Sequence, residues 1–108
     1  MDIFYALAEP RRRKILELLA RRGELTATEI YSKFDVTAQA ISQHLKILLD
    51  ARLIVMRKQA QRHIYQINPS SILELERWVK KLERELNESF DKLDLVLQVE
   101  KNSKHGEA

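Results

Sequence analysis

The feature that most constrains this chain is a pair of helix signals separated by a short turn. Thr26 and Glu29 have the spacing of a capping box, so a helix is predicted from about Thr26 to Phe34. Thr37 is a residue type that caps helix N-termini, and it predicts a second helix that ends at about Asp50. The short stretch between the two helices is expected to form a tight turn that brings them together.

The second of these helices has two distinct faces. Ile41, Leu45 and Leu48 recur with the helical period and predict the buried stripe. Polar side chains recur with the same period on another face: Gln39, Ser42, Gln43 and Lys46. An ordinary solvated helix surface has the same composition, so the role of this face depends on the fold around it.

A β-hairpin is predicted directly after the second helix. Residues 53–58 and 63–67 are rich in β-branched and aromatic side chains, and the polar residues 59–62 separate them. Two helices joined by a tight turn and followed by a hairpin describe a helix-turn-helix with a wing. The expected fold is therefore mainly α (α+β), a winged helix-turn-helix with about five helices and a two-stranded hairpin.

Three further helices complete the predicted fold. Proline is tolerated in a first helical turn, glycine ends helices, and serine caps them, which sets the expected boundaries. The three helices are expected over residues 2–8, from Pro10 to Gly23, and from Ser70 or Ser71 to about Val99. We expect one domain over residues 1–100, followed by a flexible tail over residues 101–108.

The positive charge of the chain is concentrated in one block. The formal net charge of the 108 residues is only +3, yet residues 10–62 hold twelve Lys or Arg against five Asp or Glu, a net +7. Residues 1–9 and residues 63–108 each carry a net charge of −2. A basic block is expected where a protein meets a polyanion such as nucleic acid, although a solvated basic surface has the same composition.

The composition excludes several classes of protein. There is no cysteine, which rules out disulfides, thiolate metal sites and cysteine nucleophiles. No stretch approaches the roughly 18 apolar residues of a membrane span, and the N-terminus lacks a signal-peptide pattern, so a cytoplasmic protein is expected.

Ser42 and His44 are close in sequence but lack a glycine-bearing elbow and an orienting acid, so no enzymatic activity is predicted.

The predicted fold assigns DNA contacts to two groups of residues. The major groove admits an α-helix, and Gln39, Ser42 and Gln43 can donate and accept hydrogen bonds at base edges there. Lys46 is expected to contact a phosphate. Residues 11–14 are basic, and they either flank phosphates or only keep their helix soluble. The hairpin tip carries a cluster that is expected to contact the backbone or a minor groove, or else is simply solvated: Arg57, Lys58, Gln61, Arg62 and His63.

The final helix predicts a homodimer. Apolar residues repeat along it at steps of three and four: Leu75, Val79, Leu82, Leu86, Phe90, Leu93 and Leu97. A helix of about 28 residues spans roughly 42 Å, which favours a partner over the alternative that the stripe covers only the domain's own core. The first helix is expected to join this interface through Ile3, Phe4 and Leu7. A two-fold dimer places two recognition helices about 34 Å apart, which suits a palindromic DNA site.

Three segments of the chain, residues 9–19, 36–48 and 57–67, occur in the order and spacing of a known family. With them the chain resembles the ArsR-type winged-helix repressors over about residues 2–97. The resemblance implies a homodimeric, operator-binding transcriptional repressor with the second helix of the motif as recognition helix and the hairpin as wing. It also implies a stretch that reads DNA: Thr37, Gln39, Ser42, Gln43 and His44.

The chain departs from the family pattern in two places. Many members carry a cysteine-bearing metal motif where this chain has the cysteine-free residues 28–33, so no metal and no other cofactor is predicted. The family usually has glycine after the recognition helix and in the wing turn. This chain has Arg52 and residues 59–62 at those places, a change that concerns turn geometry alone.

Alternatives to an ungated DNA-binding repressor stay open. A winged-helix module that binds protein or RNA shares the fold, although a protein-docking face would be expected to carry aromatic or aliphatic anchors in place of the polar ones. A repressor gated by a small molecule or a metal is the other alternative, and no motif specifies the inducer. An oxygen-seeking metal could use an acidic cluster on the final helix, for which solvation is the favoured interpretation: Glu88, Asp91 and Asp94.

Overall fold

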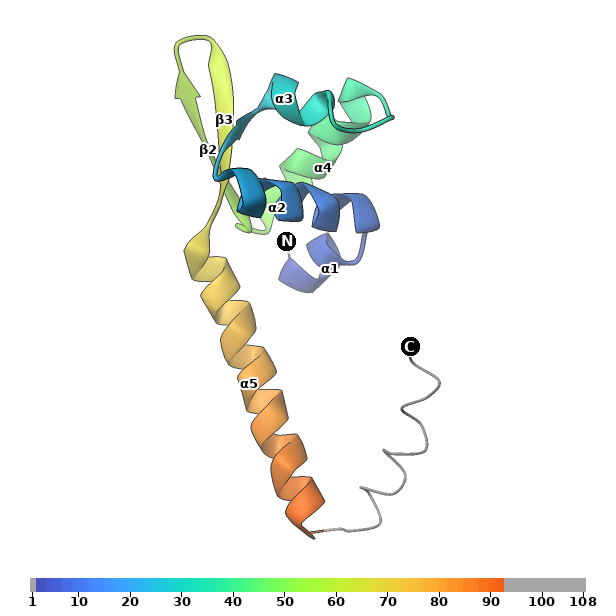
Figure 1. The fold of residues 1–108 in the computed structure, drawn as a ribbon, viewed down its shortest axis with the longest axis vertical. Coiled ribbons are helices and arrows are strands. Elements are labelled where there is room, and N and C mark those ends of the chain that lie inside the picture. The colour runs from blue at the N-terminus through green and yellow to red at the C-terminus, as the bar shows by residue number, and fades with distance from the viewer. Residues whose placement is uncertain (1, 93–108) are drawn as a thin grey trace. The chain divides into compact units, whose positions relative to one another are not determined.

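A computed structural model describes residues 2–92 of the chain. The elements follow in the order α1 (Ile3–Leu7), α2 (Pro10–Arg22), β1 (Leu25–Thr26), α3 (Ala27–Tyr31), α4 (Ala38–Asp50), β2 (Ile54–Gln59), β3 (Arg62–Ile67) and α5 (Pro69–Lys92), as Figure 1 shows. The chain divides into two compact units, one ending at Ile72 and the other beginning at Leu73, and each is described by itself. One domain over residues 1–100 stays a prediction.

Helices α1 and α2 are both capped by acidic side chains. The carboxylates of Asp2 and Glu9 accept hydrogen bonds from backbone N–H groups of the first turns that follow them. Pro10 occupies the first position of α2, and Gly23 ends the helix, both as predicted. Gly23 has a φ of 87°, a left-handed value that glycine adopts without a steric penalty.

The capping box that predicted α3 is present. The Glu29 N–H donates to the Thr26 hydroxyl at 3.2 Å, and the Glu29 carboxylate accepts from the Thr26 N–H at 2.9 Å. The helix ends at Tyr31, before the predicted Phe34. The Ser32 hydroxyl donates to the Glu29 carbonyl at 2.7 Å, and such local side-chain bonds compete with continuation of a helix.

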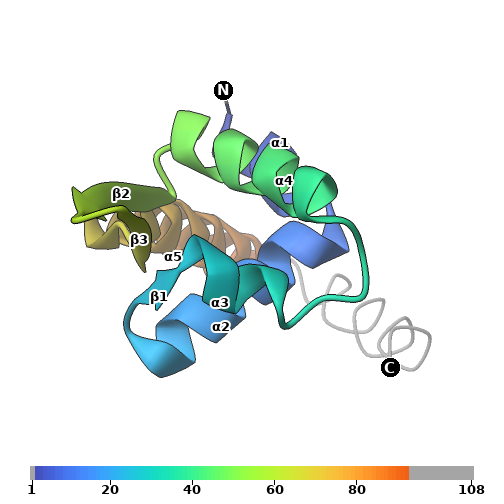
Figure 2. The ribbon, with the colours of Figure 1, turned by 90° about the horizontal axis from the view of Figure 1, so that it is seen from above.

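Helix α4 has the predicted limits and the predicted buried stripe. Thr37 caps it by accepting a hydrogen bond from the Ala40 N–H at 3.1 Å. Figure 2 shows α3 and α4 joined by the intervening loop, as in a helix-turn-helix. The side chains of Ile41, Leu45 and Leu48 are at most 2% exposed.

One apolar core holds the elements of the first unit together. Its largest fully buried side chains come from α2, α3, α4, β2 and the residue before β2: Ile15, Leu19, Ile30, Ile41, Leu45, Leu48, Leu53 and Ile54. Burial of each aliphatic side chain of this size contributes roughly 1.5–3 kcal/mol to stability. The core therefore fixes α4 against α2 and the sheet.

The wing hairpin is confirmed, and the structure adds a third strand. The sheet order is β1-β3-β2, and both pairings are antiparallel. Strand β1 pairs with β3 through Leu25 opposite Tyr65 and Thr26 opposite Ile64. The predicted two-stranded hairpin is therefore present as β2 and β3, and β1 was not predicted because its two residues are too few to show the alternation by which a strand is recognised.

The two turns that lack the expected glycines adopt left-handed backbone conformations. Arg52, after α4, has a φ of 61°, and Ala60, in the hairpin turn, has a φ of 57°. Among the described residues these are the only positive φ values outside glycine. A Cβ atom is disfavoured in this region by roughly 1–2 kcal/mol, so the chain holds both turns against a local cost.

Helix α5 begins at Pro69, and Asn68 takes the capping role that the sequence assigned to Ser70 or Ser71. The Asn68 side-chain oxygen accepts from the Ser70 N–H at 3.2 Å. Ser71 is instead buried, and its hydroxyl donates to the carbonyl of Arg52. Several predicted features lie outside the described residues: the continuation of the helix to Val99, the tail, and the residues Leu93, Asp94 and Leu97.

No helix within the described range is long and apolar enough to cross a membrane.

Candidate nucleic-acid interface

Four polar side chains of α4 are exposed beside its buried stripe: Gln39, Ser42, Gln43 and Lys46. The two amides and the hydroxyl can each donate and accept hydrogen bonds, and the ammonium adds a positive charge. The Ser42 hydroxyl lies 2.9 Å from the Tyr31 hydroxyl of α3, which fixes its position on the surface. Thr37, also exposed, uses its hydroxyl oxygen to cap the helix. The predicted reading face is therefore accessible over the first half of α4.

Exposed basic and amide side chains surround the hairpin turn. The register places Lys58 opposite His63 and Gln59 opposite Arg62, so the turn contains only Ala60 and Gln61. Lys58, Gln61, Arg62 and His63 are all exposed. The hairpin turn and the beginning of α4 lie at the same end of the first unit in Figure 1.

Arg57 is in a different environment from the other cations of the hairpin. One guanidinium nitrogen lies 3.0 Å from the Glu24 carboxylate, and another donates to the Gln66 side-chain oxygen at 3.0 Å. Glu24 directly precedes β1 and Gln66 is on β3, so both partners are away from the turn. Arg57 is therefore held by the protein itself, although its side chain remains exposed.

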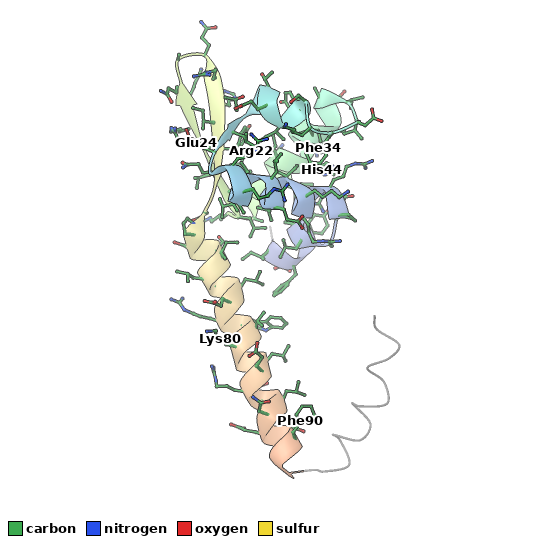
Figure 3. The ribbon with its side chains drawn as sticks, viewed as in Figure 1. Arg22, Glu24, Phe34, His44, Lys80 and Phe90 are labelled. Atoms are coloured by element: carbon green, nitrogen blue, oxygen red, sulfur yellow. The ribbon has the colours of Figure 1, made fainter. Side chains whose placement is uncertain are left out.

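His44 does not share the exposed face of α4. Its side chain is 16% exposed and points from α4 towards α2, as Figure 3 shows. Its Nδ1 lies 3.3 Å from Nη1 of Arg12, and its Nε2 lies 3.8 Å from the Glu9 carboxylate. Burial lowers the pKa of His44, Glu9 opposes the shift, and Arg12 and Arg11 reinforce it, so the ring is neutral near pH 7.

Arg12 is buried, whereas the sequence predicts it as one of four solvent-facing cations. Residues 11–14 are a run of four cations, and three of them are exposed, whereas Arg12 is only 6% exposed. The helical period contained a signal, because Arg12 precedes Ile15, Leu16 and Leu19 at the spacing of one buried face. Because all four residues of the run are basic, their charge predicts one exposed group, and that spacing is easily overlooked.

The residues predicted for the dimer interface are distributed over both units. Phe4 is 48% exposed, whereas Ile3 and Leu7 pack partly against the core of the first unit. On α5, Val79, Leu82 and Leu86 are 40–49% exposed. Leu75 and Phe90 are half-buried.

A helical core in which α3 and α4 form a helix-turn-helix, together with a three-stranded sheet that carries a basic hairpin, defines a winged helix-turn-helix protein. This fold presents one helix to the major groove and a hairpin to the adjacent backbone or minor groove. The class is thus one of DNA-binding proteins, with the polar face of α4 as the part suited to reading bases.

Known proteins agree with this class. A family model described as a helix-turn-helix domain matches residues 7–57. The transcriptional repressor SdpR of Bacillus subtilis is 35% identical over 78 residues, which are 72% of this chain and 86% of that protein. The arsenical resistance operon repressor of Staphylococcus xylosus is 38% identical over 66 residues, 61% of this chain and 62% of the repressor.

Solved structures give the same family. The crystal structure of an ArsR family transcriptional regulator has a TM-score of 0.71 and 33% identity, and covers 81% of this chain and 88% of that one. This chain belongs to the ArsR family and is a DNA-binding transcriptional regulator, which confirms the resemblance found in the sequence. The family consists of regulators of transcription, which are not enzymes.

The acidic cluster of the final helix is only partly covered by the structure. Glu88 is exposed, nothing is described of the Asp91 side chain, and Asp94 lies outside the described range. Among the residues that the structure describes, no three His, Asp or Glu side chains are grouped as a metal ion would require. A metal at this cluster stays an untested alternative.

Proposed function

We propose that this chain represses transcription as a homodimer bound to a palindromic operator. In each protomer, Gln39, Ser42 and Gln43 read base edges in the major groove, and the hairpin contacts the neighbouring backbone or minor groove. The observation that carries the proposal is the exposed polar face of α4, a helix that begins at the same end of the first unit as the hairpin turn, together with the exposed Lys58 and Arg62 that flank this turn. Side chains that discriminate base pairs and side chains that neutralise phosphates are thus available together.

The charge distribution supports DNA as the ligand of this surface. The basic block of residues 10–62 includes both α4 and the hairpin turn up to Arg62. Phosphates supply most of the affinity of DNA-binding proteins, and binding to them releases counterions. We expect Lys46, Lys58 and Arg62 to make such contacts, with Gln61 adding a neutral hydrogen bond.

The apolar side chains of α5 support the homodimer. Val79, Leu82 and Leu86 lie at helical spacing and are exposed in the single chain. A second copy offers an identical stripe, and packing the two against each other in an isologous contact removes both from water. In the first unit, we expect the exposed Phe4 of α1 to contribute to the same dimer interface.

Selection of bound sequences from randomised duplex DNA tests the operator. We expect enrichment of two half-sites related by a two-fold axis, with centres about 10 base pairs or a multiple of that apart. Sedimentation of the free protein at micromolar concentration should give twice the mass of the chain. No enriched duplex, preferential binding of RNA, or a stable monomer would each contradict the corresponding part of the proposal.

We propose that DNA binding needs neither a metal nor a catalytic step. Dialysis against a chelator should leave the operator affinity unchanged, whereas loss of binding that zinc or nickel restores would favour the metal-gated alternative. The proposed partner of this protein is chromosomal DNA. We therefore propose that the protein acts in the cytoplasm of a prokaryotic cell.

A further inference from the structure

The buried guanidinium of Arg12 has no role in the DNA surface described above. Among residues 2–90, whose exposure the structure describes, Arg12 is the only charged side chain that is buried. Removing a cation from water is costly unless hydrogen bonds and opposite charge compensate for it. The hydrogen-bond partners of Arg12 therefore show which elements its buried side chain holds together.

Arg12 connects α1 to α2. Its Nε donates to the carbonyl of Ala6 at 2.7 Å, and Nη2 donates to the carbonyl of Tyr5 at 3.1 Å. Both carbonyls belong to the last turn of α1, where a helix carries partial negative charge. The guanidinium carbon also lies 5.3 Å from the centre of the Tyr5 ring, a cation–π distance.

The remaining arm of Arg12 reaches the recognition helix. Nη1 lies 3.3 Å from Nδ1 of His44, and a neutral ring can accept this hydrogen bond. Nε2 of the same ring then carries the proton and lies 3.8 Å from the carboxylate of Glu9, the residue that caps α2. One buried cation thus links α1, α2 and α4 by directional bonds.

The position of His44 makes this link relevant to DNA reading. His44 directly follows Gln43 and lies five residues, about 1.4 turns, after Gln39 on α4. The buried stripe of α4 fixes the helix by apolar contacts, which are not directional. At about 6 Å from the helix axis, a rotation of 10° displaces a side-chain tip by roughly 1 Å, whereas recognition tolerates only about 0.5 Å.

We propose that Arg12 is a positioning residue for DNA reading, which fixes the rotation of α4 through His44 so that Gln39 and Gln43 meet base edges. This inference rests on the proposed function, since it requires that α4 read bases. It gives His44 a role inside the protein in place of the direct DNA contact that the family resemblance implied.

Acidification provides a reversible way to break the link. The charged groups that face the ring belong to α2 and its cap: Glu9, Arg11 and Arg12. Protonation of Nδ1 removes the acceptor of Arg12 and places a second cation beside it. Glu9 then attracts the charged ring by its Nε2 side, so the link to Arg12 is exchanged for an ion pair to Glu9.

The test compares three variants with the unaltered protein on its selected operator and on a scrambled duplex. His44→Leu removes the acceptor, whereas His44→Asn keeps an acceptor near the place of Nδ1 and does not titrate. Lys14→Met changes an exposed residue of α2, the helix of Arg12, and serves as the control for a substitution outside the buried link. Circular dichroism and thermal unfolding establish that each variant is folded.

We expect His44→Leu to weaken operator binding about tenfold and to leave scrambled-duplex binding unchanged. His44→Asn should restore most of the operator preference, and Lys14→Met should keep it. As the pH falls through the His44 pKa, the ratio of operator to scrambled affinity should decrease in the unaltered protein and stay constant in His44→Asn.

The outcomes separate this inference from the proposed function. If the unaltered protein has no sequence preference, the proposed function is wrong and this inference is wrong with it. If the unaltered protein prefers its operator and His44→Leu keeps that preference, or loses affinity for both duplexes equally, only the positioning role is overturned. Failure of His44→Asn to restore the preference also overturns it.

Discussion

The Arg57 guanidinium lies 3.0 Å from the Glu24 carboxylate, which separates Arg57 from the other cations of the hairpin. Both side chains are close to half exposed, so water screens the pair and its net stabilisation is small. The main consequence of the pair is that it fixes the direction of the Arg57 side chain, since Gln66 holds the same guanidinium from the neighbouring strand. Arg62 is the first residue of β3, directly after the turn.

This difference makes Arg57 a matched control for Arg62. Arg62→Ala should weaken binding to operator and scrambled duplex alike, and reduce the salt slope by about one, since it removes a phosphate contact. Arg57→Ala removes the same charge but should have a clearly smaller effect on both. Titrations at several salt concentrations measure the two slopes. A loss confined to the operator would show that Arg62 reads bases.

Gln43 is expected to contribute to sequence preference. Gln43→Ala should cost about 1–3 kcal/mol on the selected operator and little on a scrambled duplex, because an amide can form a bidentate pair with a base edge. Gln59→Ala removes an exposed amide from β2 and serves as the control. If Gln43→Ala lowers both affinities equally, α4 does not lie in the major groove as proposed.

The sequence was sufficient to predict the helix-turn-helix because its signals are local. Thr26 with Glu29, and Thr37 with the stripe from Ile41, each specify a helix within a few residues, and the structure contains both. Strand β1 could not be predicted in this way, since two residues become a strand only by pairing with Tyr65 and Ile64 far along the chain.

The candidate site was predictable to the extent that it lies on one face of one helix. Exposure of Gln39, Ser42 and Gln43 follows from the period of α4. The environments of His44 and Arg57 depend on partners 32 and 33 residues away, Arg12 and Glu24, and no local pattern specifies such contacts.

The hairpin turn allows a prediction about backbone strain. Ala60 has a φ of 57°, so Ala60→Gly should remove a steric cost of roughly 1–2 kcal/mol from the folded state. Part of this stabilisation is offset because glycine has more conformational freedom in the unfolded chain. We expect a net increase of about 0.5–1 kcal/mol in the free energy of unfolding. Ala20→Gly, at an exposed position of α2, should instead decrease it by about 1 kcal/mol. Urea denaturation measures both, and equal signs would contradict the assignment of strain to the turn.

The capping box of α3 predicts a dependence of stability on pH. Hydrogen bonds from the backbone and side chain of Thr26 hold the pKa of Glu29 below its ordinary value of 4.5, with Arg62 and Arg22 adding to the shift against some desolvation. A carboxylate with a lowered pKa stabilises the fold above its unfolded pKa, and this contribution is lost as the pH falls through the folded pKa. The melting temperature should therefore decrease below about pH 4.5, and less so in Glu29→Gln. Glu17→Gln controls for the loss of one carboxylate, and an equal pH dependence in Glu29→Gln and the unaltered protein would exclude the cap as its source.

The proposed dimer depends most on α5, because its exposed leucines are the residues that we expect to pack between the two copies. Leu86 is 47% exposed, so Leu86→Asp removes little packing within one chain, yet it would place a charge inside an isologous contact together with its symmetry mate. We expect the variant to sediment as a folded monomer, with operator affinity reduced by more than tenfold, since two half-sites can no longer be bound as one unit. Asn87→Asp adds the same charge at the adjacent exposed position and should remain dimeric. A Leu86→Asp protein that keeps its dimeric mass would show that the copies meet elsewhere, and a monomer that retains full operator affinity would show that the dimer is not needed for DNA binding.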